Sequence, residues 1–228
     1  MNFKRLFAVH STHAPLSEKV RSGIAGGAAI FLLAVAVKYL PLHSYPLAML
    51  GSMAASAVLL FAVPHSPLAQ PWNLVGGHFV SALAGGVSVL LIHEPTIAAG
   101  VGVGLAIFMM HYLNCLHPPG AATALTIILS SAYFQEMGWK WVTLVIIINV
   151  GISLLLALGI NSLIPGRHYP MQTAAHPPKK PSSVISIEQP DLEWALEQMN
   201  EVVDVSEEDL ASIYKLAQNH AQERASRA

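Results

Sequence analysis

Charged residues are scarce in the middle of this 228-residue chain, of which only 11% is charged overall. Between residues 23 and 164 the formal charges are Lys38, Glu94, Glu136 and Lys140. A soluble domain carries about 25% charged residues, so this region is not an ordinary soluble domain. No cluster of basic residues that would bind nucleic acid is present either. The composition therefore indicates a membrane domain.

Cysteine is also nearly absent, since Cys115 is the only one in the sequence. A single cysteine excludes an intrachain disulfide and any metal site built from cysteine pairs. A zinc site built from His78, His111 and His117 would lack the carboxylate or thiolate cluster that completes such sites. No nucleophile–base pair or carboxylate dyad is visible, so we expect neither an enzyme nor a cofactor.

What the chain has in quantity is apolar sequence, divided into six segments. They lie near 22–40, 46–63, 72–92, 96–114, 118–133 and 140–164. A helix needs roughly 20 residues to span a membrane, and the segments at 46–63 and 118–133 are short. The sequence thus predicts an all-α, polytopic membrane bundle with short or broken helices, built on six crossings or on four crossings plus a re-entrant pair.

The charge pattern divides the chain into four parts. We expect a cytoplasmic N-terminal segment at 1–21, a transmembrane domain at 22–166, a Pro-rich linker at 167–187 and an amphipathic helical tail at 188–228. Lys and Arg concentrate before the first and after the last apolar segment. This pattern predicts that both termini of the protein, in a bacterial inner membrane, face the cytoplasm. The tail is expected to form a helical hairpin that packs on the membrane domain or on a neighbouring subunit.

An internal repeat is visible at an offset of 67 residues. AASAVLL at 54–60 aligns with AATALTI at 121–127, and the same offset pairs Trp72 with Trp139. Each unit would hold three apolar segments, and an odd number of crossings makes the second unit inverted relative to the first. Inverted repeats with interrupted helices at their interface are a recurring transporter design.

Three proline-marked helix starts lie in or near the predicted membrane region. They follow Pro46, Pro71 and the Pro118–Pro119 pair. A helix N-terminus presents unpaired N–H groups and about half a positive charge. Three such ends facing one cavity would bind an anion without a lysine or arginine.

The candidate site residues surround these helix starts. His117 and His78 could each donate a hydrogen bond to an anion or carry a proton that travels with it. Ser52, Ser56 and Thr123 lie just inside helix starts, where they could cap backbone or contact a solute. The other candidates for substrate binding are Asn73, Gly76, Gly77, Asn114, Pro118, Pro119 and Gly120. Asn149 and Asn161 are expected to be structural.

Four motifs in order carry a resemblance to a known family. They are GSMAASAVLLF at 51–61, SPLAQPWNLVGGH at 66–78, HPPGAATAL at 117–125, and Asn161 with RHYP at 167–170. Together they resemble the HPP family of integral membrane proteins over most of residues 20–170. The resemblance implies about four transmembrane helices and transport of nitrite or another small anion.

The sequence therefore predicts a transporter or channel for a small, nitrite-like anion, bound at helix N-termini near His117. Coupling to a proton is left open. Because short helices need cover from neighbours, we expect a homo-oligomer in the lipid bilayer. The alternative is a membrane-embedded sensor or scaffold that acts through its C-terminal tail.

Overall fold

The computed structural model describes residues 15–39 and 49–171 together with Tyr214. Residues 20–173 form one compact unit, and the fold is described within that unit. Every regular element among its described residues is helical. The elements are α2 (Leu16–Lys38), α3 (Ser52–Ala62), the short 3-10 helix η1 (Pro67–Ala69), α4 (Pro71–Leu91), α5 (Pro95–Tyr112), α6 (Pro118–Leu129), α7 (Ser131–Met137) and α8 (Trp139–Leu163). Apart from Tyr214, the expected tail helices lie outside the described residues.

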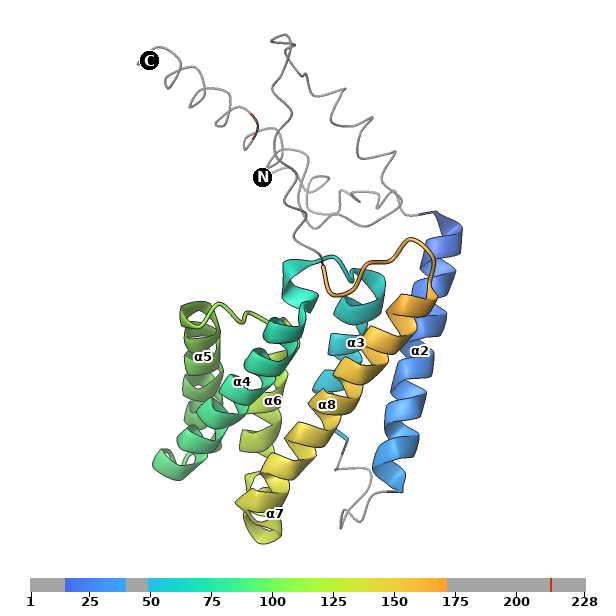
Figure 1. Ribbon diagram of the computed structural model, residues 1–228. Coiled ribbons are helices and arrows are strands. Elements are labelled where there is room, and N and C mark those ends of the chain that lie inside the picture. The colour runs from blue at the N-terminus through green and yellow to red at the C-terminus, as the bar shows by residue number, and fades with distance from the viewer. Residues whose placement is uncertain (1–14, 40–48, 172–213, 215–228) are drawn as a thin grey trace, which may run out of the picture. The chain divides into compact units, whose positions relative to one another are not determined.

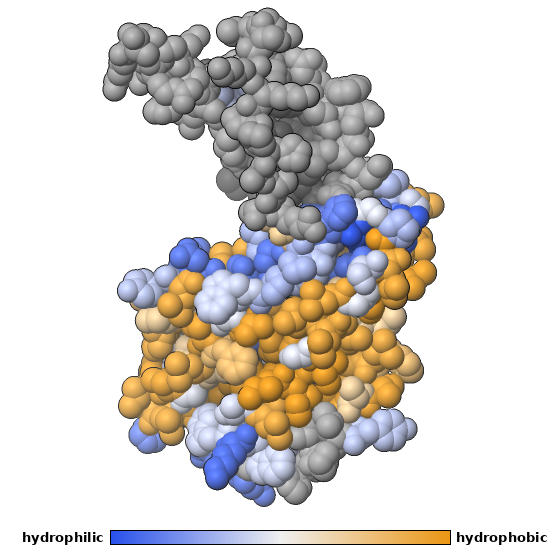
Figure 2. Space-filling model, viewed as in Figure 1, coloured by the Kyte–Doolittle hydropathy of each residue, from blue (hydrophilic) through white to orange (hydrophobic). Residues whose placement is uncertain are grey.

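Four of these helices are long and apolar enough to cross a membrane. They are α2, α4, α5 and α8, with 18 to 25 residues each. The two segments that the sequence marks as short form α3 with 11 residues and α6 with 12 residues. The surface carries a broad apolar band with polar groups gathered toward both ends (Figure 2). These lengths match four crossings plus a short pair better than six full crossings.

Local sequence explains where the short helices begin and end. α6 begins with Pro118 and Pro119, whose fixed φ suits the first turn of a helix. It ends at Leu129, and the separate helix α7 continues to Gly138, which has φ 89°. α3 ends at Ala62, two residues before Pro64, because the residue before a proline is disfavoured in the helical conformation.

Apart from the short helices η1 and α7, successive helices alternate in direction along the chain (Figure 1). α4 packs against both α5 and α6, while α3 contacts α6 and α8. α2 buries one stripe at helical spacing, formed by Ala25, Ala29, Leu33 and Val37. Large apolar residues elsewhere on α2 remain exposed, as a lipid-facing helix requires.

α8 holds both ends of the short helix α3 through two asparagines. The Leu50 N–H, just before α3, donates to Asn149 Oδ1 at 3.1 Å. At the other end Asn161 Nδ2 donates to the Leu60 carbonyl at 3.0 Å. Polar side chains that bond across helices in this way stabilise membrane bundles. Both asparagines therefore have the structural role that the sequence predicts.

The helix bounds follow the 67-residue offset in part. Adding 67 to Ser52–Ala62 gives 119–129, which coincides with α6 to within one residue. Adding 67 to Pro71–Leu91 gives 138–158, which falls on α8. Adding 67 to Leu16–Lys38 gives 83–105, which overlaps the end of α4 and the start of α5. The inverted repeat therefore stays a prediction.

Candidate functional site

Five polar side chains meet inside the apolar bundle. We call them the polar cluster: Ser52, Ser56, His78, His117 and Thr123. Ser52 is 3% exposed and the other four are 0% exposed. They come from α3, α4, α6 and the residue that precedes α6, separated by up to 71 positions in the chain. The sequence names all five as site candidates, and the fold brings them together.

Hydrogen bonds connect every member of the polar cluster. Ser56 Oγ lies 3.0 Å from His78 Nε2 and 2.9 Å from His117 Nε2. His78 Nδ1 lies 2.7 Å from Thr123 Oγ1, which in turn lies 2.8 Å from Ser52 Oγ. The two imidazole rings are 5.1 Å apart between centroids and tilted by 60°. No member of the cluster carries a fixed charge.

Glycines allow α4 and the start of α6 to approach closely. A Cβ on Gly77 would lie 2.5 Å from the His117 Cβ and 3.1 Å from the Cys115 carbonyl oxygen. A Cβ on Gly120 would lie 2.7 Å from the Gly77 carbonyl oxygen. A Cβ atom essentially never lies within 3.0 Å of another heavy atom, so a larger residue at either position would force the packed backbone to shift. Gly77 and Gly120 thus place the His117 imidazole beside that of His78.

The short helix η1 closes one end of the polar cluster. His117 Nδ1 lies 2.8 Å from the Leu68 carbonyl oxygen, at the centre of η1. The neighbouring Ala69 carbonyl accepts a hydrogen bond of 2.9 Å from the Tyr169 hydroxyl. Burial raises the pKa of Tyr169, so this phenol stays a donor throughout the physiological range.

The remaining candidates take supporting positions around the cluster. Asn73 Nδ2 donates to the Leu116 carbonyl at 2.8 Å and so ties α4 to the turn before α6. Gly76 is buried, and a Cβ there would lie 2.7 Å from the Cys115 Cβ. Asn114 is exposed with φ 52°, which identifies it as a left-handed turn residue apart from the cluster.

The start of α6 offers fewer N–H donors than the sequence argument requires. Pro118 is exposed and Pro119 is buried, and neither has an N–H group. The Gly120 N–H donates to the His117 carbonyl at 2.8 Å. None of these three positions therefore offers a free N–H group, and binding of an anion at this helix start stays a prediction. The other donors here are the side-chain hydroxyls and imidazoles of the polar cluster, which bond to one another and to backbone carbonyls.

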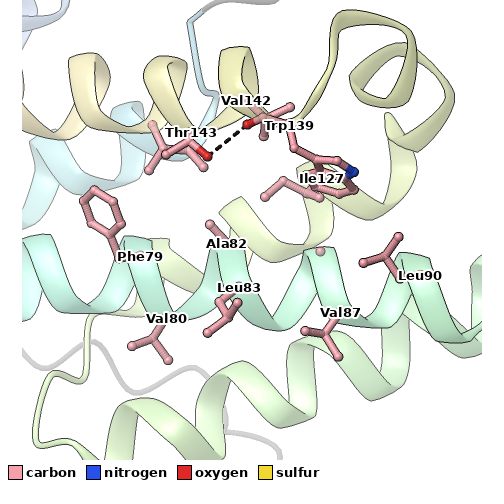
Figure 3. Close-up of a pocket in the computed structure, with 12 residues that line it drawn as sticks. Phe79, Val80, Ala82, Leu83, Val87, Leu90, Ile127, Trp139, Val142 and Thr143 are labelled. Atoms are coloured by element: carbon pink, nitrogen blue, oxygen red, sulfur yellow. Dashed lines mark hydrogen bonds between the residues drawn. The ribbon is translucent and has the colours of Figure 1, made fainter.

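A separate apolar groove of about 500 Å³ lies between α4 and α8 (Figure 3). Phe79 and Leu83 line it from α4, and Trp139 and Ile146 line it from α8. Thr143, which also lines the groove, donates to the Trp139 carbonyl at 2.9 Å. No member of the polar cluster lines this groove. Its walls are mainly apolar, and the Trp139 indole is the other lining side chain that carries a polar hydrogen.

Within the described ranges 15–39 and 49–171, no group of three or more His, Cys, Asp or Glu side chains is placed to hold a metal ion.

Glu94 lies at the opposite end of α4 from the cluster and caps α5, where its carboxylate accepts from the Ile97 N–H at 2.7 Å. That bond holds the pKa of the Glu94 carboxyl below its usual range. Glu94 therefore acts as the N-cap residue of α5.

Three positions near the site were not singled out from the sequence. Leu68 contributes only its backbone carbonyl, so no sequence pattern marks it. Tyr169 supports η1, and Arg167 donates to Asn161 Oδ1 and to Ser22 Oγ, each at 2.9 Å. Tyr169 and Arg167 both belong to the RHYP motif at 167–170, which is the sequence pattern that marks them.

Comparison with known proteins gives the chain a family but no solved relative. The model of the family described as HPP, transmembrane region, matches residues 11–170. Two transmembrane proteins of Dictyostelium discoideum are similar. One is 42% identical over 127 residues, which cover 54% of this chain and 44% of the relative. The other is 38% identical over 165 residues, covering 69% of this chain and 52% of the relative.

The chain thus spans about half the length of the curated relatives that it matches. No solved structure matches it. The names of the relatives state a location in a membrane and no activity.

Proposed function

Because the chain belongs to the HPP transmembrane region family, and because a fully buried polar cluster lies inside its apolar bundle, we propose that it moves a small anion across a membrane through that cluster. The observation that carries the proposal is the meeting of His78 and His117 with three hydroxyl groups, all within hydrogen-bonding distance. Polar groups are costly inside a membrane protein and commonly mark a solute or ion path.

The two short helices support a path at this point. α3 begins with Ser52, which belongs to the polar cluster, and α6 begins directly after His117. Helices that start inside the membrane are tolerated where they line a site rather than face lipid. Transporters often place interrupted helices around a central binding site. The ends of α3 and α6 thus favour transport over a purely structural cluster.

The chemistry of the cluster suits a small monovalent anion. The hydroxyls of Ser52, Ser56 and Thr123 can turn their hydrogens toward an anion, and each imidazole supplies an N–H. The absence of a fixed cation within the cluster makes binding weak enough for release. The start of α6 adds a partial positive charge through its dipole. Nitrite is the anion that we favour, on the family resemblance.

We also propose the setting in which this transport occurs. The protein would be a homo-oligomer in a bacterial inner membrane, with both termini in the cytoplasm. The Lys and Arg residues that flank the first and last apolar segments support this orientation.

Flux into liposomes that contain the full-length protein tests the proposal. The panel is nitrite, nitrate, formate, chloride and phosphonate, compared with protein-free liposomes. We expect at least one anion, nitrite first, to move faster than the background. His117→Ala should lower that flux by about tenfold or more, because a charge-assisted or neutral donor to the anion is lost. His111→Ala is the matched control, since His111 is exposed in the last turn of α5.

A pair of conservative substitutions distinguishes the loss of a transport contact from misfolding. Thr123→Val keeps the shape of the side chain and removes the hydroxyl that bridges Ser52 and His78. Thr126→Val changes the same helix three residues later, where the exposed hydroxyl only donates to the Ala122 carbonyl. We expect Thr123→Val to reduce flux and Thr126→Val to leave it unchanged. If no anion in the panel crosses above background, the proposed function fails.

A further inference from the structure

The polar cluster makes more hydrogen-bond contacts than its five side chains, when neutral, have polar hydrogens. Six contacts join the five side chains to each other and to the carbonyls of Ser52 and Leu68. Each contact needs one hydrogen. Three hydroxyls and two neutral imidazoles provide one hydrogen each, which makes five. With one hydrogen to each contact, the sixth contact requires an added proton.

The two carbonyls fix where every hydrogen lies. Neither can donate, so His117 Nδ1 donates to the Leu68 carbonyl and Ser56 Oγ donates to the Ser52 carbonyl. Ser56 has then used its only hydrogen, so it accepts from Nε2 of both histidines. His117 consequently carries hydrogen on both nitrogens. His78 remains neutral, and its Nδ1 accepts from Thr123.

Removing the added proton requires one local change. The Ser56 hydrogen turns from the Ser52 carbonyl, 3.2 Å away, to the bare Nε2 of His117, 2.9 Å away. The other contacts keep their hydrogens. The lost contact is the longest of the six. We propose that the polar cluster binds a single proton on Nε2 of His117, with the Ser56 hydroxyl as the group that reorients.

The surroundings of His117 determine what must accompany the proton. From α4 it faces His78, from α3 Ser56, and from η1 the Leu68 carbonyl. The turn before it holds the Cys115 thiol, and the Tyr169 hydroxyl bonds the carbonyl next to that of Leu68. None of these groups is a carboxylate. A buried cation without a counter-charge is costly, so an anion must bind with the proton.

This step rests on the proposed function and specifies its coupling. A proton from bulk water bonds to Nε2 of His117, and a monovalent anion binds beside it. The pair is electrically neutral, so it can cross an apolar bundle that has no fixed charge at the site. Transport would then move protons and anions in a one-to-one ratio.

Nitrogen-15 NMR of histidine in the full-length protein tests the proton site directly. Spectra would be recorded from about pH 8 to about pH 4.5, the range in which histidines titrate, with and without saturating nitrite. His117→Ala and His78→Ala assign the signals. We expect His117 to change from the Nδ1–H tautomer to the doubly protonated form, and His78 to stay in the Nε2–H tautomer. An Nε2–H tautomer for neutral His117, or no protonation with or without nitrite, would overturn the proposal.

Ser56→Ala and Ser162→Ala provide the matched pair for the reorienting hydroxyl. Ser162 is exposed on α8 and donates only to the Gly159 carbonyl. Loss of the Ser56 oxygen removes an acceptor from the imidazolium, so the proton affinity of His117 should fall roughly tenfold. Ser162→Ala should leave it unchanged. Equal affinities in the two variants would show that Ser56 does not hold the proton in place.

Proton and anion counts in the liposome assay separate the two proposals. A pH-sensitive dye reports protons that enter with each anion, after subtraction of flux in protein-free liposomes. One proton per anion supports both proposals. Anion flux without protons overturns the proton site and leaves anion transport standing. Absence of anion flux defeats the proposed function, while the NMR titration still decides whether His117 binds a proton.

Discussion

At the scale of single residues, Gly77 is the glycine whose replacement by a larger residue would create the closest contact. A methyl group there would overlap His117 Cβ at 2.5 Å. The turn that holds His117 is fixed by backbone hydrogen bonds from the Cys115 N–H to the Met110 carbonyl and from the Gly120 N–H to the His117 carbonyl. Gly77→Ala should therefore destabilise the protein by about 2 kcal/mol or more through overpacking. We expect the midpoint of thermal unfolding in detergent to fall by roughly 4 °C or more.

Gly104→Ala is the control for this prediction. Gly104 lies in α5, and a Cβ there meets no atom within 4 Å. Alanine favours a helix over glycine by about 1 kcal/mol, so this variant should be neutral or more stable. Equal stability of the two variants would mean that α4 and α6 do not pack as closely as described.

The candidate residues could be named from the sequence, but their contacts could not. His78, His117 and the three hydroxyl residues stand out because polar groups are rare in apolar segments. Their meeting depends on packing between helices that lie 22 to 71 positions apart. Asn114 is also a polar residue beside an apolar segment, so the sequence marks it in the same way. Its local turn, however, gives it a left-handed backbone conformation and an exposed side chain.

At the scale of elements, η1 positions the Leu68 carbonyl against His117. Tyr169 is the positioning residue, because its hydroxyl bonds the next carbonyl along, that of Ala69. Tyr169→Phe should cost about 1 to 3 kcal/mol, since it leaves a buried acceptor without its donor. It should also lower anion flux, because Leu68 is then held less firmly. Thermal unfolding and liposome flux check the two effects.

Tyr133→Phe is the matched control. Among the described residues the buried Tyr133 hydroxyl has no hydrogen-bond partner. Its removal should be neutral or stabilising and should not change flux. If Tyr169→Phe behaves like Tyr133→Phe in both measurements, η1 does not position the site.

Helix starts were the most predictable elements, because proline acts locally. Pro71, Pro95 and Pro118 each occupy the first helical position of α4, α5 and α6. The short length of α3 and α6 also follows from local breaks. The loss of N–H donors at Pro118 and Pro119 is equally local, and it follows from the chemistry of proline itself. The acceptor on η1 is a backbone atom 49 positions from His117, which no side-chain pattern indicates.

At the scale of the whole molecule, the directions of the helices predict which loops share a side of the membrane. The start of α2 and the end of α8 lie at one end of the bundle, and the α4–α5 turn lies at the other (Figure 1). In a Cys115→Ala background, Val20→Cys and His168→Cys should react with an impermeant maleimide from the cytoplasmic side. His93→Cys should react from the opposite side. All three positions are exposed.

Right-side-out and inside-out membrane vesicles distinguish the two faces in this assay. Labelling of Val20→Cys and His168→Cys from different faces would require an odd number of crossings and would contradict the bundle described. Labelling of all three from one face would contradict the direction assigned to α4.

The central claim is that a solute reaches the polar cluster, and Ser56→Cys in the Cys115→Ala background tests it most directly. Ser56 is 0% exposed, so a small thiol reagent reaches it only if a path opens. Ala84→Cys, on α4 at 3% exposure and outside the polar cluster, is the control. The measurement is the rate of modification in liposomes with and without the transported anion.

The account predicts that Ser56→Cys is modified, that Ala84→Cys is not, and that anion at ten times its dissociation constant slows the reaction about tenfold by occupying the site. Failure of Ser56→Cys to react in liposomes that transport the anion, or reaction at a rate that the anion does not change, would contradict a path through the polar cluster.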